Sequence, residues 1–435
     1  MGQLWALIDV NNFFVSCERI FRPDLEKKPV AVLSSNDGCI VSRSQEVKDL
    51  GIAMGTPKFQ IEEQIKKEGI VCFSSNYRLY GDISTRAMAT IRETVGEARQ
   101  EVYSIDECFI RLTGMKERDW QDWARNWRAR LRREIGLPVS VGVAQTKTLA
   151  KLAVEIAKKD FLGDGTMVWL SNDKSWQKQY FGQIPVTQVW GIGRASARKL
   201  LAARINTVEQ LIAKDQAWIR QRFGLTGEKT WRELQGESCI ELTEVLPSHR
   251  QILRSGSFGA PVTTLKGLEQ AIAGHLSVAV EQLRREKLRA SMVSVMIRTS
   301  YFVEKQKAYS GVVTQGLAES TSYLPDLMRS AIKSLHQAYV PGKAYKKAGI
   351  ILSGLEREEA WQPAMWLEDG SQIEDEKKQA VMKAMNQLNH DFGARKVGVG
   401  WAGMAQVDER AKWRRKSAWR SDEYSTNWEQ LRRVK

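Results

Sequence analysis

Residues 101–112, EVYSIDECFIRL, have the pattern of two short strands that fold back on each other and meet at an aspartate followed directly by a glutamate. Two adjacent carboxylates repel each other, and this pair has apolar neighbours, so the arrangement is costly unless a cation offsets the charge. The plain alternative is a polar turn, in which aspartate is common. The hairpin therefore marks either a turn or a cation site, and a third carboxylate nearby would favour the site.

The segments around this hairpin alternate between strand and helix patterns. Leu4–Asp9 is a short apolar run typical of a buried strand, and residues 84–96 have apolar residues at helical spacing. A second helix is expected over residues 119–136, followed by a strand at residues 138–144. The order strand, helix, hairpin, helix, strand predicts a ferredoxin-like βαββαβ sheet with an insertion after its first strand.

Residues 146–159, TKTLAKLAVEIAKK, predict one more helix with two different faces. At about 100° per residue, Lys147, Lys151 and Lys158 fall close together, while the leucines lie on the far side. Such a lysine face is commonly just solvated. Beside a polyanion it would be a row of phosphate contacts.

From about residue 165 the pattern changes to short helices around VWGIG, residues 189–193. Gly191 and Gly193 form a glycine turn that opens a helix, and a second helix is expected to begin near residue 207, which is the pattern of a helix-hairpin-helix. In that motif the backbone N–H groups and a helix N-terminus approach a DNA phosphate. These contacts grip the DNA backbone without reading its sequence.

After a connection at residues 240–250, the βαββαβ order is expected a second time. Strands are expected at residues 251–259, 291–298, 310–317 and 348–355, with helices at residues 265–288 and 325–339. The polar tail from about residue 356 has one expected helix near residues 374–389 and a basic stretch at 411–420. We expect this tail to dock partners or to be partly mobile.

Composition narrows the possible partners and the compartment. The 435 residues carry 66 Lys and Arg against 51 Asp and Glu, a net charge of +15 that favours a polyanionic partner. Five scattered cysteines without CxxC spacing predict neither a disulfide framework nor a zinc site. With no signal peptide and no apolar run of about 18 residues, we expect a soluble protein of a reducing cytoplasm.

Asp9 supplies the third carboxylate, because it ends the first strand, which lies beside the 101–112 hairpin in a split βαβ sheet. Asp9, Asp106 and Glu107 can then converge. Hard cations take oxygen ligands, and two Mg²⁺ ions about 3.5 to 4 Å apart would need such a cluster. The residues thus predict a site for two Mg²⁺ ions.

Several stretches resemble the Y-family DNA polymerases: IDVNNFF, SIDE and VWGIG. CERIFRPDL, KPVAVLSSNDGCIVSRS, VCFSSNYRLYGD and GVAQTKTLAKLA resemble the UmuC subfamily, the catalytic subunits of bacterial DNA polymerase V. The resemblance covers the chain to about residue 355 and thins in the tail, where the terminal LRRVK also matches.

The resemblance implies a role for each catalytic carboxylate. Asp9 and Asp106 would bridge both metals, Glu107 would hold the metal that activates the primer 3′-hydroxyl, and the Val10 carbonyl would be a further ligand. Phe14 falls at the aromatic steric gate against a ribose 2′-hydroxyl, where UmuC proteins usually have tyrosine.

The resemblance also assigns the basic and small residues around the site. Ser42, Lys48 and Lys158 match positions that hold the incoming triphosphate. Lys147 and Lys151 would face the primer-template, as would the two glycines of VWGIG.

The implied architecture is that of a right-hand polymerase. It comprises a palm at residues 1–10 and 76–165, helical fingers at 11–75, a helix-hairpin-helix thumb at 166–240, a little finger at 245–355 and a partner-binding tail at 356–435. The implied activity is error-prone translesion synthesis from dNTPs in the SOS response.

The implied partners are a UmuD′-like dimer, a RecA filament and a sliding clamp, with no membrane, in the bacterial cytoplasm at the nucleoid. The clamp would bind QPAMW through Gln362, Met365 and Trp366. Two other functions remain open. A non-catalytic UmuC-like scaffold would lack the three acids, and a nucleotide cyclase would lack the helix-hairpin-helix and the second basic domain.

Overall fold

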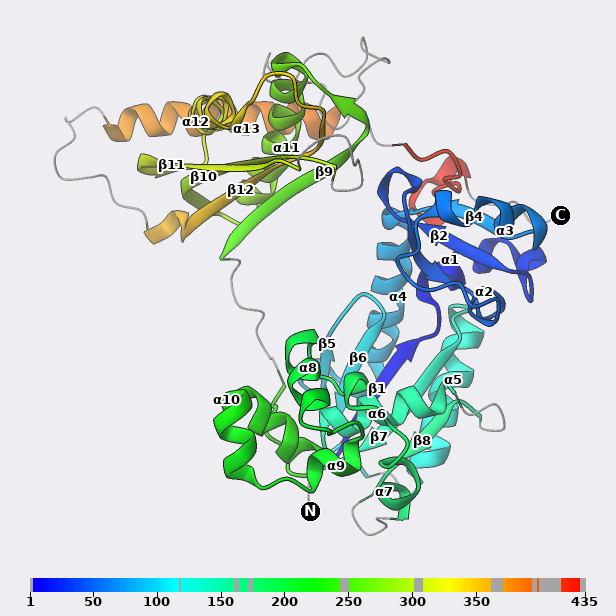
Figure 1. Ribbon diagram of the computed structural model, residues 1–435. Helices are drawn as coiled ribbons and strands as arrows, with labels where there is room; N and C mark the ends of the chain where they lie inside the picture. The colour runs from blue at the N-terminus through cyan, green and yellow to red at the C-terminus, as the bar shows by residue number, and fades with distance from the viewer. Residues whose placement is uncertain are drawn as a thin grey trace. The chain divides into compact units, whose positions relative to one another are not determined.

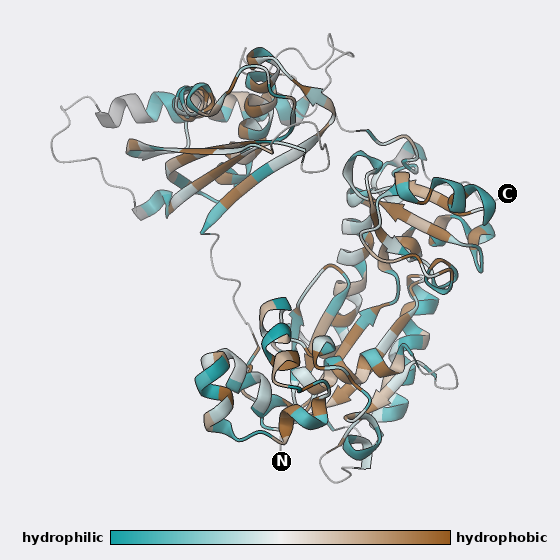
Figure 2. Ribbon diagram, viewed as in Figure 1, coloured by the Kyte–Doolittle hydropathy of each residue, from teal (hydrophilic) through white to brown (hydrophobic). Residues whose placement is uncertain are grey.

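A computed structural model describes residues 3–116, 119–159, 164–170, 175–242, 250–300, 308–360, 371–392, 397–398 and 416–430. The chain forms two compact units (Figure 1). The first comprises residues 1–34, 39–246 and 419–435, and the second comprises residues 35–38 and 247–418. In both units the strands are mainly apolar, and the helices carry both apolar and polar residues (Figure 2).

The first unit contains the predicted βαββαβ order. The elements are β1 (Trp5–Val10), α4 (Tyr77–Val95), β5 (Gln100–Val102), β6 (Glu107–Arg111), α5 (Trp120–Glu134) and β7 (Val139–Ala144). The sheet order is β5-β6-β1-β7-β8, where β8 (Thr166–Val168) runs parallel to β7 and the other pairs are antiparallel. The expected hairpin and the ferredoxin-like sheet are confirmed.

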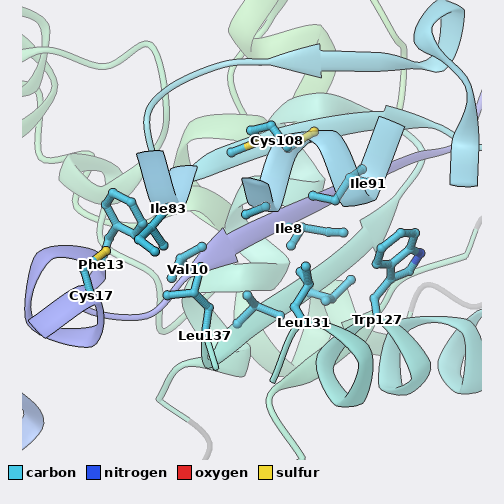
Figure 3. Close-up of a cluster of buried hydrophobic side chains, with 14 of the residues drawn as sticks. Ile8, Val10, Phe13, Cys17, Ile83, Ile91, Cys108, Trp127, Leu131 and Leu137 are labelled. Atoms are coloured by element: carbon cyan, nitrogen blue, oxygen red, sulfur yellow. The ribbon is translucent and has the colours of Figure 1, made fainter. Parts of the chain in front are cut away.

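The two faces of this sheet are covered by different helices, because successive side chains of a strand point to opposite sides. Ile8 and Val10 pack with α4 and α5, together with Leu131 and Leu137 (Figure 3). Trp5 and Leu7 pack on the other face with α6 (Lys147–Ala157). The site carboxylate Asp9 is in phase with Trp5 and Leu7, so it belongs to the α6 face.

Gly142 allows α6 to lie directly on the sheet. A Cβ atom at this position of β7 would stand 2.4 Å from the carbonyl oxygen of Ala150 and 2.7 Å from the backbone nitrogen of Val154. Only glycine permits this approach. The close packing brings the lysines of α6 within reach of the strand ends.

The insertion after β1 is a small α/β layer. It comprises α1 (Phe13–Phe21), β2 (Val30–Leu33), β3 (Ile40–Arg43), α2 (Gln45–Asp49), α3 (Glu62–Lys67) and β4 (Val71–Ser74). The strands form a sheet of order β3-β2-β4. We expected a helical segment here, and the sheet was missed because strands of four residues are too short to show alternation.

Helices follow β8, as the glycine turn predicted. They are α7 (Ser175–Tyr180), α8 (Arg194–Ala202), α9 (Val208–Ile212) and α10 (Gln216–Leu234). Gly191 has φ +90°, a backbone conformation that favours glycine, and Gly193 is the N-cap of α8. The paired helices on either side of residues 203–207 confirm the expected helix pair.

The second unit repeats the chain order but not the strand order. It comprises β9 (Gln251–Val262), α11 (Leu265–Arg285), β10 (Leu288–Thr299), β11 (Ser310–Thr321), α12 (Leu324–Ala338), β12 (Tyr345–Arg357) and α13 (Ser371–Asp391). The sheet is antiparallel with order β11-β10-β12-β9, so its first and last strands are neighbours. In the first unit the corresponding strands β1 and β7 are also neighbours, but β1 there lies between β6 and β7 instead of at the edge.

Part of the tail belongs to the first unit. Residues 419–430 pack there and include two short 3₁₀ turns, η8 (Tyr424–Thr426) and η9 (Trp428–Gln430). The expected clamp-binding residues Gln362, Met365 and Trp366 lie outside the described residues. Among the described helices, none is both long and apolar enough to cross a membrane.

Candidate active site

Asp9 and Glu107 are direct neighbours across two strands. They are register partners in the antiparallel pair β1 and β6, so both side chains lie on the face that α6 covers. Asp9 is 7% exposed. The structure therefore brings the acid of the first strand to the acidic pair of the hairpin, as the sequence predicted.

Asp106 stands beside this pair at the start of β6. Its backbone carbonyl accepts a hydrogen bond from the backbone N–H of Val10, at 2.9 Å. The Ser104 hydroxyl donates to Asp106 Oδ1 at 2.6 Å and fixes that carboxylate. Ser104 was not singled out from the sequence, although it precedes the acidic pair in the same SIDE stretch.

Two lysines of the α6 face neutralise two of the three acids. Lys158 Nζ lies 2.9 Å from Asp9 Oδ2, and Lys151 Nζ lies 2.7 Å from Glu107 Oε1. Lys158 also contacts Glu155 at 3.1 Å. The charged groups at the end of the sheet thus form a compact network of acids and ammonium groups.

Burial raises the pKa of Asp9 to about 7, because it disfavours the ionised form. Lys158 acts against this shift, whereas Glu107 and Asp106 add to it by repulsion. Burial alone would lower the pKa of Lys158, but Asp9 and Glu155 outweigh it and the pKa of this ammonium is raised. Asp9 is thus a carboxylate whose ionised form requires nearby positive charge.

The three acids supply the kind of oxygen ligand that divalent metal ions bind, and the backbone brings these residues close together. Carboxylate and carbonyl oxygens are the ligands that Mg²⁺ prefers. As the side chains stand, however, no group of three or more acidic, histidine or cysteine residues in the described parts of the chain can hold a metal ion. A metal-bound arrangement requires Lys151 and Lys158 to release the carboxylates they contact.

Phe14 lies in α1, just after the end of β1, and is held by aromatic rings. It stacks on Tyr80 with a centroid distance of 4.6 Å, and the edge of Tyr77 approaches it at 5.8 Å. Both tyrosines come from α4. Neither was singled out from the sequence, although they lie in the same NYRLYGD stretch.

Three cations gather from the insertion and from α6. Partial burial lowers the pKa of Lys48, and the positive charges of Lys158 and Arg43 lower it further. Ser42, on the neighbouring strand β3, is buried. Glu155 and Asp49 partly offset this repulsion, and a phosphate group would stabilise the Lys48 ammonium further. The sequence reasoning missed Arg43.

Lys147 does not lie on an exposed lysine face, and that prediction is wrong. Its side chain is fully buried, with Nζ 2.6 Å from Glu101 Oε2 and 2.7 Å from the Glu241 carbonyl oxygen. The ammonium also lies over the rings of Trp5 and Phe109. Its charge is satisfied within the fold, so Lys147 has a structural role here.

The VWGIG turn contacts the hairpin through aromatic residues. Trp190 donates a hydrogen bond from Nε1 to the Tyr103 hydroxyl at 2.9 Å. Lys151 lies over the Tyr103 ring at 4.6 Å. Gly191 and Gly193 are exposed beside this contact. The helix-hairpin-helix is therefore attached next to the acidic site.

Three family models match segments of the chain. The impB/mucB/samB family model matches residues 8–155, and the C-terminal domain model of that family matches residues 249–365. A model described as a domain of unknown function (DUF4113) matches residues 379–434.

Relatives extend over most of the chain. Protein UmuC of Salmonella typhimurium is 39% identical over 433 residues, covering 99% of this chain and 100% of that protein. A DNA polymerase IV of Corynebacterium diphtheriae is 29% identical over 361 residues, covering 81% of this chain and 76% of that protein. The solved Y-family DNA polymerase chimera Dbh-Dpo4(243-245)-Dbh has the same fold, with a TM-score of 0.64 at 18% identity, over 81% of this chain and 99% of that chain.

The chain belongs to the UmuC-type branch of the Y-family DNA polymerases. It is a DNA polymerase of the translesion class, and the family relationship implies a dependence on divalent metal in general. The nucleotide cyclase alternative falls with this assignment.

Proposed function

We propose that this chain extends a primer past damaged template bases by two-metal nucleotidyl transfer in the SOS response. The primer 3′-hydroxyl attacks the α-phosphate of a dNTP, a P–O bond forms, and pyrophosphate leaves. The observation that carries the proposal is the side-by-side placement of Asp9 and Glu107, next to Asp106, at one end of the sheet.

In this proposal the acids hold two Mg²⁺ ions. Asp9, Asp106, Glu107 and the Val10 carbonyl would be the ligands that hold these ions. The ions would supply positive charge at the attacking and leaving oxygens. Ser104 holds the Asp106 carboxylate in place through its hydroxyl.

Lys158, Lys48 and Ser42 are the proposed triphosphate contacts. Support comes from the positive charges of Lys158 and Arg43, which act on Lys48 and lower its pKa. Phe14 is the proposed steric gate. Its half-buried ring, held by Tyr80, is bulky enough to exclude a ribose 2′-hydroxyl.

The proposed DNA contacts come from α6 and from the helical segment that contains α8. Lys151, Gly191 and Gly193 would face the primer-template, and α8 adds exposed basic residues at Arg194, Arg198 and Lys199. In domain terms we assign the palm to residues 1–10 and 76–165, the fingers to 11–75, the thumb to 166–240 and the little finger to 245–355. The net charge of +15 over the whole chain supports DNA binding.

A UmuD′-like dimer, a RecA filament and a sliding clamp are the proposed partners, with action in the bacterial cytoplasm at the nucleoid. Support comes from the identity of 39% to protein UmuC over nearly the whole chain. Deleting residues 362–366 should abolish clamp stimulation of synthesis. Unchanged stimulation would exclude these residues as the clamp contact.

Primer extension with Mg²⁺ tests the proposed function directly. Wild-type protein and Asp106→Ala are compared on damaged and undamaged templates, with and without UmuD′ and RecA. We expect extension by the wild type alone. Equal activity of the two proteins would refute the site, and inactivity of both with intact partner binding would favour the scaffold.

A further inference from the structure

The C-terminal strap, defined as residues 419–427, is bound to the first unit by several specific contacts. It begins at the end of β4, where the backbone N–H of Ser74 donates to the Trp419 carbonyl at 3.0 Å. The Trp419 N–H donates in return to the Ser74 hydroxyl at 3.0 Å. Lys58 lies over the Trp419 ring at 4.7 Å. These contacts fix the first residue of the strap against the first unit.

The middle of the strap is held by a buried amide. Asn76 is fully buried, and its Nδ2 donates to the carbonyl oxygens of Ser421 at 3.3 Å and Asp422 at 3.0 Å. Two residues further on, the buried Tyr424 ring stacks on Phe21 of α1, with centroids 4.3 Å apart and an interplanar angle of 4°. A buried amide paired with two backbone carbonyls indicates a built contact between the strap and the unit.

From the strap, a chain of contacts reaches Phe14. The Ser421 hydroxyl donates to Glu18 Oε1 at 3.0 Å, and the Tyr80 hydroxyl donates to the same oxygen at 2.6 Å. The Tyr80 ring then stacks on Phe14. Glu18 and Tyr80 are both fully buried, so these side chains have little room to rearrange.

Few other interactions hold the Glu18 carboxyl group in place. Its second oxygen, Oε2, has no hydrogen-bond partner within the described parts of the chain. The two hydroxyls on Oε1 therefore orient the carboxyl group, and one of the two comes from the strap. Phe14 has no hydroxyl of its own, so its ring position depends on packing against Tyr80 and Tyr77.

We propose that the C-terminal strap is part of the nucleotide pocket: Ser421 positions Tyr80 through Glu18, and Tyr80 holds Phe14 where it excludes a ribose 2′-hydroxyl. This inference rests on the proposed function, in which Phe14 faces the sugar. It gives a role to part of a segment that matches a domain of unknown function. Ser421 is thus a positioning residue for sugar selection.

The test compares three variants of the full-length chain, two at Ser421 and one at Ser425. Ser421→Ala removes the hydroxyl that Glu18 accepts from, and Ser421→Thr keeps a hydroxyl there. Ser425→Ala is the matched control, because Ser425 donates to Asp82 Oδ2 at 2.7 Å and anchors the strap to α4 without reaching Glu18. The measured quantity is the ratio of kcat/KM for a dNTP to that for the matching rNTP.

We expect Ser421→Ala to lower this ratio roughly fivefold, the factor that corresponds to one hydrogen bond of about 1 kcal/mol. Ser421→Thr and Ser425→Ala should keep the wild-type ratio. A purely structural role would lower the activity toward both nucleotides together and leave the ratio unchanged. An unchanged ratio in Ser421→Ala would overturn the proposal.

The same ratio is also measured as nucleotide affinity in a complex with a dideoxy-terminated primer, which needs no turnover. A wild type that selects dNTP in this complex but extends no primer would overturn the proposed function alone. A wild type that selects by affinity and a Ser421→Ala variant that no longer does would support the role of the strap. Equal selection by both proteins would refute it.

Discussion

Asp9 and Glu107 face each other across β1 and β6, and each carboxylate contacts a different lysine, Lys158 and Lys151 respectively. The acids are close because antiparallel register partners point to the same side of a sheet. The lysines are close because Gly142 lets α6 lie on that side. Positive charge at this point is therefore built into the fold and suits an anionic nucleotide, whereas a metal ion would have to displace these lysines from the two carboxylates.

Replacing Asp9 with asparagine should remove activity without unfolding the protein. Burial holds the pKa of Asp9 at about 7, so a neutral side chain of the same shape suits this environment. We expect kcat to fall about 100-fold to 1,000-fold or more, by the scale of a lost charge-stabilising group, with an unchanged Tm. Primer extension and thermal unfolding check the two expectations. The exposed Asp122→Asn in α5 is the control, and a matching loss of activity in it would contradict the assignment.

Lys158 and its neighbour Lys159 provide a matched pair for the triphosphate site. Lys158 lies near Asp9 and Lys48, whereas Lys159 contacts Gln188 at 2.9 Å away from the acids. A charge-assisted contact contributes about 1.5 to 3 kcal/mol, so Lys158→Ala should raise the KM for dNTP about 10-fold or more. Lys159→Ala should leave it near the wild-type value. Steady-state kinetics on one primer-template measure both, and equal KM values would argue against Lys158 as a phosphate contact.

The sequence was sufficient for the parts of the fold that have a local signature. The hairpin and the flanking helices follow from periodicity, and the structure has them where expected. Asp9 joined the other acids because a ferredoxin-like sheet places the first strand beside the hairpin. The strand order of the second unit had no such signature, since the same chain order allows more than one sheet.

Contacts between distant residues could not be predicted. Helical phase placed Lys147 beside Lys151, but it could not show that Glu101 and the rings of Trp5 and Phe109 enclose the first lysine. Ser421 contacts Glu18 across 403 residues of sequence, and no sequence pattern in either segment indicates this contact. Such pairings are fixed by the tertiary fold alone.

Lys147 should therefore act on stability and not on DNA affinity. Breaking a buried ion pair by removing one partner costs about 3 to 5 kcal/mol, so Lys147→Met should lower the unfolding free energy by about that amount. The folded fraction should bind DNA with an unchanged salt dependence. The exposed Lys199→Ala in α8 should do the opposite, lowering the slope of log Kd against log salt by about 1. Urea unfolding and DNA binding at several salt concentrations check both, and a changed slope in Lys147→Met would contradict its structural role.

The raised pKa of Glu18 predicts that the protein loses stability as the pH rises. Burial raises the pKa of Glu18 to about 7 from its ordinary 4.5, although hydrogen bonds from Tyr80 and Ser421 and the charge of Arg22 act against the shift. The folded state thus binds a proton at Glu18 more tightly than the unfolded state does. The stabilisation that Glu18 contributes is therefore full below pH 4.5 and is lost as the pH rises through 7.

We expect the unfolding free energy to fall by up to about 3 kcal/mol over this window, at about 1.4 kcal/mol per pKa unit. Glu18→Gln cannot ionise, so its stability relative to the wild type should improve between pH 5 and pH 8. Any fixed cost of burying the amide cancels in that comparison. Urea unfolding at both pH values measures it, with Glu93→Gln on the exposed side of α4 as the control. If Glu18→Gln and wild type lose stability in parallel between the two pH values, the folded-state pKa of Glu18 is not raised into this range.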